Sequence, residues 1–125
     1  MRRLSLLLLL LAALPAAQAA DPLAAGRAAF KRCANCHQVG PGARSNFGPQ
    51  LNGIVGRRSG AAPDFSYSPA MRNANLVWTE KNLAAFLRDP DAIVPGNKMR
   101  FWGIGNERQI ADLLAYLRAA KGGNP

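Results

Sequence analysis

Hydrophobic positions along the chain predict three helices and no sheet. The first helix is expected at residues 21–32, where apolar residues follow an Asp-Pro pair that suits a helix start. The second begins at Thr79 and stops at Asp89, just before a proline. The third begins at a cap, Asn106, and ends at Gly122. No run of alternating β-branched residues occurs, so we expect no strands.

The segments between these helices are long and rich in glycine and proline, above all at residues 38–69. Loops of that length are unusual in a compact domain. They predict a chain that wraps around something that is not protein. Gly26, in the middle of the first helix, indicates a close contact with another helix.

Residues 1–20 have the pattern of a secretory signal peptide. Two arginines precede an apolar run, Leu4–Leu14, and Ala17-Gln18-Ala19 forms a small-x-small cleavage site. The run is too short to cross a bilayer comfortably, which disfavours the alternative, a retained membrane anchor. We therefore expect a cleaved leader at 1–20, export in a bacterium, and a single domain at 21–125.

Length and composition further limit the classes of protein to which the chain can belong. The chain has 125 residues and a formal net charge of +9, which becomes +7 without Arg2 and Arg3. This size excludes large enzymes, channels, repeat proteins and multi-domain architectures. Two cysteines exclude a disulfide framework. A small core is expected to need a metal or cofactor. Nucleic-acid binding is poorly supported, because no basic helix with interleaved aromatic residues occurs.

The residues Cys33-Ala34-Asn35-Cys36-His37 form a C-x-x-C-H motif, which is an attachment site of c-type haem. Two thiols three positions apart on a helical turn can add to the two vinyl groups of one porphyrin, and the next residue then lies under the iron. A thioredoxin-type dithiol needs a βαβ context, and a structural zinc site needs four ligands. A plain disulfide would leave His37 unexplained. The motif predicts one covalent haem with iron.

The other axial ligand cannot be a second histidine from this chain, because His37 is the only one. The candidates are Met71, Met99, a lysine such as Lys98, and water. Met99 is favoured because it lies in a rigid Pro-Gly loop far from His37 in the sequence. A thioether ligand raises the reduction potential. Two axial ligands leave no position for oxygen, peroxide or substrate, which argues for electron transfer and against catalysis.

Several further motifs accompany the haem motif. They are Gly48-Pro49-Gln50-Leu51-Asn52-Gly53, Gly56-Arg57-Arg58-Ser59-Gly60, Phe65-Ser66-Tyr67-Ser68, Trp78-Thr79-Glu80, Pro95-Gly96-Asn97-Lys98-Met99 and Ala115-Tyr116-Leu117. With them the chain resembles the class I cytochromes c over residues 26–120, in particular mitochondrial cytochrome c and related bacterial periplasmic carriers. The resemblance implies an all-α fold of about three main helices, with long ordered loops around one haem. It also implies that the terminal helices cross where Gly26 and Phe30 meet Leu113 and Tyr116.

The resemblance implies a role for each residue of the iron site. Cys33 and Cys36 would form the thioether bonds, and His37 would be the proximal ligand. The carbonyl of Pro49 would accept a hydrogen bond from the second nitrogen of His37 and so fix its tautomer. Met99 would be the distal ligand.

The resemblance also implies a site for one buried haem propionate. Tyr67 and Trp78 would donate hydrogen bonds to it, and Arg57 would balance its charge, because a buried carboxylate without donors is costly. Asn97 stands close to the same group, in place of a threonine. For Tyr67 and Trp78, ordinary core packing is the alternative interpretation.

Three positions besides Asn97 depart from the pattern of the family. Phe86 replaces a tyrosine that usually donates to the ligand sulfur. Met71 replaces an asparagine that usually lies near buried water. Trp102, which follows an expected aromatic at Phe101, is unusual there. These changes affect the tuning of the haem rather than the fold.

The function implied is that of a mobile one-electron carrier, not an enzyme. It would be a periplasmic monomer that takes electrons from a membrane quinol-oxidising cytochrome complex. It would deliver them, in transient contacts at the membrane surface, to a terminal oxidase or a photosynthetic reaction centre. Basic residues such as Arg32, Lys98 and Arg100 would steer it onto acidic partners, unless they serve only solubility. Two alternatives remain: a peroxidase-type haem enzyme with a labile distal ligand, and a dedicated acceptor of one periplasmic dehydrogenase.

Overall fold

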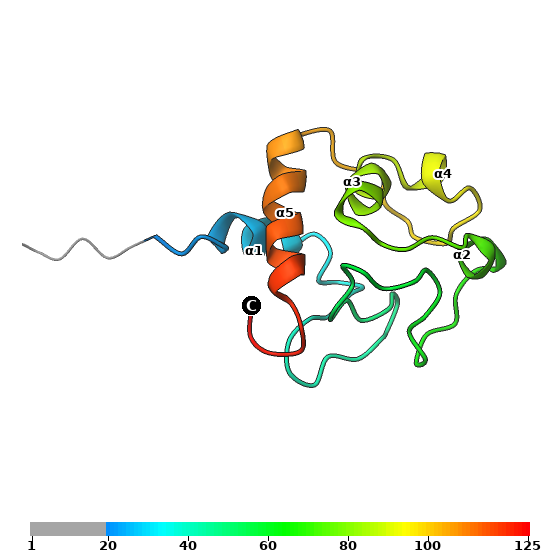
Figure 1. Cartoon of the computed structure of the whole chain (residues 1–125), viewed down its shortest axis with the longest axis horizontal. Helices are drawn as coiled ribbons and strands as arrows, with labels where there is room; N and C mark the ends of the chain where they lie inside the picture. The colour runs from blue at the N-terminus through cyan, green and yellow to red at the C-terminus, as the bar shows by residue number, and fades with distance from the viewer. Residues whose placement is uncertain (1–19) are drawn as a thin grey trace, which may run out of the picture.

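The computed structural model describes residues 20–125, and these residues form five helices and no strand. The helices are α1 (Ala24–Phe30), α2 (Pro69–Asn73), α3 (Glu80–Arg88), α4 (Pro90–Ile93) and α5 (Glu107–Ala119), joined by long loops (Figure 1). One isolated antiparallel bridge joins Arg58 and Val77. The expected leader at 1–20 lies, except for Ala20, outside the described residues. Within the described part, no helix is both long and apolar enough to span a bilayer.

Among the described residues, the crossing of α1 and α5 is the most extensive contact between two helices (Figure 1). Gly26 makes it possible, because a Cβ atom built there would lie 2.1 Å from the carbonyl oxygen of Asp112 and 2.7 Å from the Cβ of Tyr116. Beside it, the rings of Phe30 and Tyr116 pack with centroids 5.4 Å apart. Leu113, on the same side of α5, is fully buried. The predicted crossing at Gly26 is therefore confirmed.

The second and third predicted helices start where the sequence places them. The hydroxyl of Thr79 accepts from the backbone N–H of Asn82 at 3.1 Å, and the side chain of Asn106 accepts from that of Gln109 at 3.1 Å. Each side chain satisfies a donor that the first helical turn leaves unpaired. Helix α5 ends at Ala119, slightly before Gly122, whose φ of 96° turns the chain away.

The start predicted for the first helix is wrong. Asp21 does not cap a helix, because its carboxylate accepts from the N–H of Leu23 at 2.9 Å in a tight turn, and α1 begins only at Ala24. The same carboxylate accepts from the guanidinium of Arg27 at 2.7 Å. Because this local turn competes with the helix for the backbone, α1 begins three residues later than predicted.

Helices α2 and α4 were not expected from the hydrophobic pattern. Each begins with a proline at its first position, which follows Ser68 in α2 and Asp89 in α4. The hydroxyl of Ser68 accepts from the N–H of Met71, and the carboxylate of Asp89 accepts from that of Ala92, both at 3.1 Å. Asp89 thus ends α3 and starts α4, so the proline that stops one helix opens the next.

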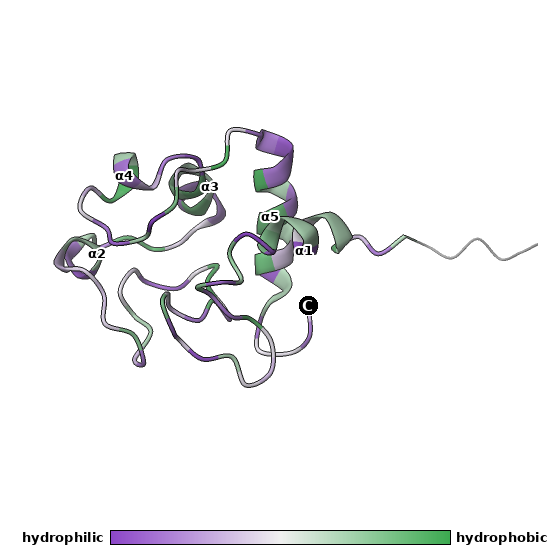
Figure 2. Cartoon of the chain, turned by 180° about the vertical axis from the view of Figure 1, so that it is seen from behind, coloured by the Kyte–Doolittle hydropathy of each residue, from purple (hydrophilic) through white to green (hydrophobic). Residues whose placement is uncertain are grey.

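The core lies between α1, α3 and α5, and the loops enclose the rest of the interior. Helix α5 carries both hydrophilic and hydrophobic stretches (Figure 2), and its buried residues face this core. At the far end of α3, the guanidinium of Arg88 donates two hydrogen bonds to the carboxylate of Glu107, at 2.7 and 2.8 Å. This pair joins the ends of the segment 89–106, which runs from α3 to α5 and carries Met99.

Candidate haem site

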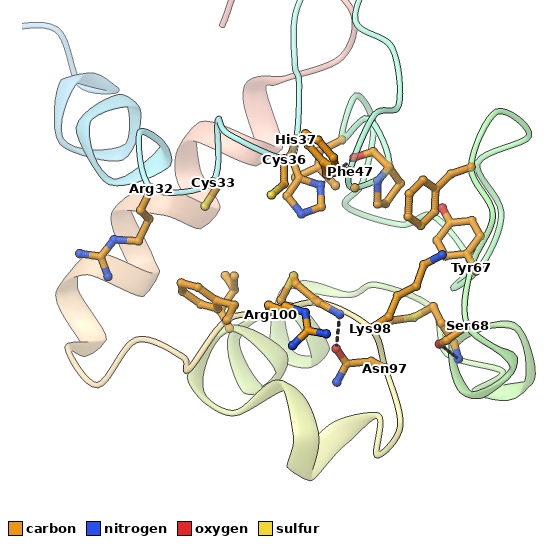
Figure 3. A pocket seen from close by; sticks show the side chains of 18 of the residues that line it. Arg32, Cys33, Cys36, His37, Phe47, Tyr67, Ser68, Asn97, Lys98 and Arg100 are labelled. Carbon is orange, nitrogen blue, oxygen red and sulfur yellow. Dashed lines mark hydrogen bonds between the residues drawn. The ribbon is translucent and has the colours of Figure 1, made fainter.

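A cavity of about 410 Å³ opens between two walls formed by different segments of the chain (Figure 3). One wall is the segment that follows α1, with Cys33, Cys36 and His37. The other is the loop between α4 and α5, with Met99. The volume lies in the range of sites that bind small molecules and cofactors. The structure therefore brings together the four residues that the sequence predicts to hold the haem and its iron.

The imidazole of His37 is fixed in position from two sides. Its Nδ1 donates to the carbonyl oxygen of Pro49 at 2.7 Å, which leaves Nε2 as the unprotonated ring nitrogen. Gly48 lies directly against the ring, because a Cβ atom there would come within 2.5 Å of it. The ring points into the cavity (Figure 3). The histidine is thus positioned, and in the tautomer needed, to coordinate a metal through Nε2.

Burial also keeps this histidine neutral. Desolvation lowers the pKa of His37, the hydrogen bond to Pro49 partly opposes that shift, and the positive charge of Arg57 adds to the lowering. A neutral imidazole keeps the lone pair on Nε2 that binds iron. Metal ligation therefore does not have to compete with a proton at neutral pH.

The two cysteines are free thiols that border the same cavity. They lie on a helical turn, in which the N–H of Cys36 and the N–H of His37 both donate to the carbonyl of Cys33, at 3.1 and 2.9 Å. Burial raises the pKa of the Cys33 thiol. The turn presents both sulfur atoms and the imidazole to one space, as attachment of a porphyrin by two thioethers requires.

Asn97 organises the loop that carries Met99. Its side-chain oxygen accepts from the N–H of Met99 at 2.9 Å, and its amide nitrogen donates to Asp91 and to the carbonyl of Val94, both at 2.9 Å. The amide is therefore already engaged with the protein, although the residue lines the cavity. Its contact with a propionate stays a prediction, and its positioning of Met99 was not expected from the sequence.

Lys98 lines the cavity from the same loop. Its ammonium donates to the carbonyl of Ser66 and lies 4.9 Å from the centroid of the Phe65 ring. The side chain thus reaches across to the loop that carries Tyr67 (Figure 3). Met71 borders the cavity as well, from α2. Of the three protein candidates for the distal ligand, Lys98 is held by another contact, and both methionines are within the site.

A second, inner cavity of about 90 Å³ collects the residues predicted to surround the buried propionate. Arg57, Tyr67 and Trp78 all line it, together with Met71 and Phe86. The guanidinium of Arg57 is held at one end by the carbonyls of the segment 50–52, at 2.7 and 3.3 Å. The structure thus brings these predicted residues together.

The donors of this inner cavity match a carboxylate. The hydroxyl oxygen of Tyr67 accepts from the N–H of Ala62 at 3.1 Å, so the phenol proton is left to be donated. Trp78, whose indole N–H is a hydrogen-bond donor, lines the cavity and is 5 % exposed. Arg57 supplies a partly buried positive charge. A buried carboxylate would find two donors and a counter-charge here.

The residues present therefore fit a c-type haem. A neutral imidazole, a thioether and two free thiols border one cavity, and a glycine leaves room beneath the histidine. Within residues 20–125, no group of three or more His, Cys, Asp or Glu side chains could hold a metal ion, so the four-ligand zinc alternative has no support there.

An all-helical fold with this cavity defines a haem protein of the class I cytochrome c type. The chain matches the cytochrome c family over residues 23–121, and it belongs to that family. It is 45% identical to cytochrome c2 of Blastochloris viridis over 118 residues, which cover 94% of this chain and 93% of that protein. It is 50% identical to cytochrome c2 of Agrobacterium tumefaciens over 98 residues, 76% of this chain and 88% of that one.

Solved structures agree with this assignment. Cytochrome c2 from Rhodospirillum centenum superposes with a TM-score of 0.75 at 36% identity, covering 85% of this chain and 100% of that one. The predicted family, the all-α fold, the covalent haem with iron and the function as a mobile electron carrier between membrane complexes are confirmed.

Proposed function

We propose that His37 and Met99 are the two axial ligands of a haem attached through Cys33 and Cys36. The observation that carries the proposal is that His37, held by Pro49, and Met99 line one cavity, Met99 from the loop whose Lys98 and Arg100 lie across from His37 (Figure 3). The bound haem supplies one-electron redox chemistry at its iron. The protein keeps the imidazole of His37 neutral and oriented, and it fixes the backbone of Met99. The apolar side chains that line the cavity exclude water.

We further propose that Arg57, Tyr67 and Trp78 bind one propionate in the inner cavity. The support is their convergence on a single space whose other lining residues, His37 apart, are apolar. A carboxylate there would lose its water and gain two hydrogen bonds and a positive charge in exchange. Asn97 would act on the haem through the backbone of Met99 and would lie close to the propionate, as predicted.

The proposed ligand pair makes this protein a carrier and not an enzyme. Two axial side chains leave no open coordination position for an external substrate. We propose that it works as a monomer in the bacterial periplasm, which the leader pattern of residues 1–20 supports. Electrons would come from a membrane quinol-oxidising cytochrome complex and go to a terminal oxidase or a photosynthetic reaction centre.

The charge around the cavity supports acidic partners. Arg32, Lys98 and Arg100 are exposed residues that line it, and no aspartate or glutamate does. A positive rim attracts negatively charged surfaces and orients them toward the site. It raises the rate of encounter most at low ionic strength, where screening is weak.

An optical redox titration of the haem-loaded protein tests the ligand assignment. We expect a far-red sulfur-to-iron band and a high, positive midpoint potential. The substitution Met99→Ala removes that band and lowers the midpoint by on the order of 100 mV, well inside the ~0.8 V range that axial ligands span. The matched control is Met71→Leu, because Met71 lines both cavities, and it keeps the band.

Two outcomes would contradict the proposal. Loss of the band in Met71→Leu, but not in Met99→Ala, would make Met71 the ligand. Tight binding of added cyanide or imidazole by the unmodified protein would show an accessible iron, and would favour the peroxidase-type enzyme.

A further inference from the structure

Trp102 is the most exposed large apolar side chain among residues 20–125, with a relative exposure of 101 %. The others are Phe47 at 78 %, Val77 at 40 % and Ile93 at 37 %. Phe47 lines the haem cavity, so its exposure belongs to that site. Trp102 lines neither cavity, so its exposure is not explained by the haem site. Isolated surface leucines need no explanation, but a fully exposed indole leaves an unusually large apolar area in water.

The backbone holds Trp102 on a segment fixed on both sides. On one side, the N–H of Phe101 donates to the carbonyl of Met99 at 3.1 Å, and Phe101 lines the haem cavity. On the other side, the N–H of Ile104 donates to the carbonyl of Leu87 at 2.8 Å, and Ile104 is buried. An anchor on a fixed segment loses little backbone entropy when a partner binds it.

Gly103 makes the turn after Trp102 possible. Its φ is +99°, and a Cβ atom there would lie 2.1 Å from the carbonyl oxygen of Arg88. No other residue could take this place without moving the segment. The chain therefore turns back onto α3 directly after Trp102, and leaves the indole on the outside of the bend.

The segment just before Trp102 carries two positive charges, Lys98 and Arg100. Arg100, two residues earlier, is exposed and lines the haem cavity with Arg32 and Lys98. Tryptophan and arginine are the residue types that most often dominate the energy of protein interfaces. An apolar ring beside a positive rim complements a protein surface that has an apolar recess bordered by carboxylates.

We propose that Trp102 is the apolar anchor of the docking surface, inserted into a recess on the acidic face of a membrane-bound redox partner. The proposal rests on the carrier function proposed above. The basic rim brings the two proteins together, and the indole determines how tightly the complex holds once formed. The two contributions respond differently to salt, because screening weakens charge pairs and leaves apolar burial almost unchanged.

The test is the oxidation of reduced, haem-loaded protein by native membranes of the source bacterium, measured as KM and kcat at low and high salt. Oxidation is by the oxidase in the dark or by the reaction centre after a flash. We expect Trp102→Ala to raise KM about tenfold at both salt concentrations, within the range of interface hot spots. Trp102→Phe, which keeps an aromatic ring, should have a KM close to that of the wild type. The midpoint potential and the far-red band should not change.

Two further variants separate this proposal from the carrier function. Val77→Ala removes another exposed apolar side chain that lines neither cavity, and should leave KM unchanged. Arg100→Gln should raise KM at low salt only. If Arg100→Gln raises KM at low salt but the KM of Trp102→Ala stays within twofold of the wild type, then Trp102 is not an anchor, although the basic residues still form a docking surface. If neither variant changes KM, that surface is wrong as well.

Two other binding partners for Trp102, a lipid surface and a second copy of the chain, are tested by direct binding measurements. Sedimentation of the wild type, but not Trp102→Ala, with protein-free vesicles of phosphatidylglycerol and phosphatidylcholine would assign the indole to the lipid surface. A dimer that forms at micromolar concentration and disappears in Trp102→Ala would assign it to a second copy of the chain. Either result would overturn the proposal of an acidic protein partner.

Discussion

The substitution Gly26→Ala sets two physical effects against each other at the crossing of α1 and α5. Alanine favours the helical state over glycine by about 1 kcal/mol, so helix propensity alone predicts a more stable protein. The close contact between the two helices predicts a less stable protein. The new Cβ would lie 2.1 Å from the carbonyl oxygen of Asp112, whereas ordinary contacts begin at 3.4 Å. The helices would have to separate by about 1.3 Å, the difference between these two distances.

That separation disrupts the packing of Phe30 on Tyr116, whose rings lie 5.4 Å apart. A gap of about 1 Å already forfeits a quarter to a half of each contact's attraction. Overpacking costs about 1–3 kcal/mol, and a clash with backbone belongs at the upper end of that range. After the gain in propensity, we expect Gly26→Ala to lower the free energy of unfolding by about 2 kcal/mol. For a domain of this size, that corresponds to a decrease in Tm of about 8 °C or more.

Guanidinium denaturation of the haem-loaded protein, followed by far-ultraviolet circular dichroism, measures this loss. The matched control is Ala25→Gly, at the neighbouring exposed position of α1, which should cost about 1 kcal/mol through propensity alone. Opposite substitutions at adjacent positions should thus both destabilise the protein. A Gly26→Ala protein as stable as the wild type, or more stable, would refute the reasoning from the close crossing.

Three further predictions concern individual contacts. Gly48→Ala should push the imidazole of His37 off its carbonyl acceptor, because the new Cβ would come within 2.5 Å of the ring; we expect a lower Tm by calorimetry and a changed Soret spectrum, and an unchanged spectrum would contradict it. Asn97→Ala should weaken the far-red band on warming at temperatures where the wild type keeps it, because the loop loses three hydrogen bonds. Hydrogen bonds from Ser45 lower the pKa of Asp64 below its usual 3.8, so the carboxylate stabilises the fold above that pH and loses its effect as the pH falls through the lower, folded-state pKa. The stability difference between Asp64→Ala and the wild type should therefore shrink between pH 7 and pH 3 in urea titrations, and a difference independent of pH would contradict the assignment.

The parts of the fold that were predictable from the sequence depend on local interactions. The starts of α3 and α5 follow from Thr79 and Asn106, because a capping side chain and the backbone N–H that donates to it lie within one turn. Helices α2 and α4 were missed because a proline after Ser68 or Asp89 is compatible with a loop or a helix stop as well as with a helix start. Which occurs depends on packing that the local sequence does not contain.

The same distinction applies to the haem site. The C-x-x-C-H motif identifies its chemistry because the thiols and the imidazole act within five consecutive residues. The contacts that complete the site join distant segments. Lys98 reaches the carbonyl of Ser66, 32 residues away, and no sequence pattern indicates this pairing, since it arises only when the two loops meet. The side chain of Asn97 binds nearby residues instead, from Asp91 in α4 to Met99, and these bonds were missed because an Asn in a loop is compatible with many partners.

The support behind His37 and Met99 has a consequence for the speed of electron transfer. The imidazole is held between Gly48 and the carbonyl of Pro49, and the backbone of Met99 is held by Asn97. Side chains fixed in this way have little freedom to rearrange when the charge beside them changes by one unit, so the reorganisation energy is small, as in other preorganised sites. Self-exchange between oxidised and reduced molecules should then be limited by the approach of two positively charged surfaces, and should accelerate as added salt screens their repulsion.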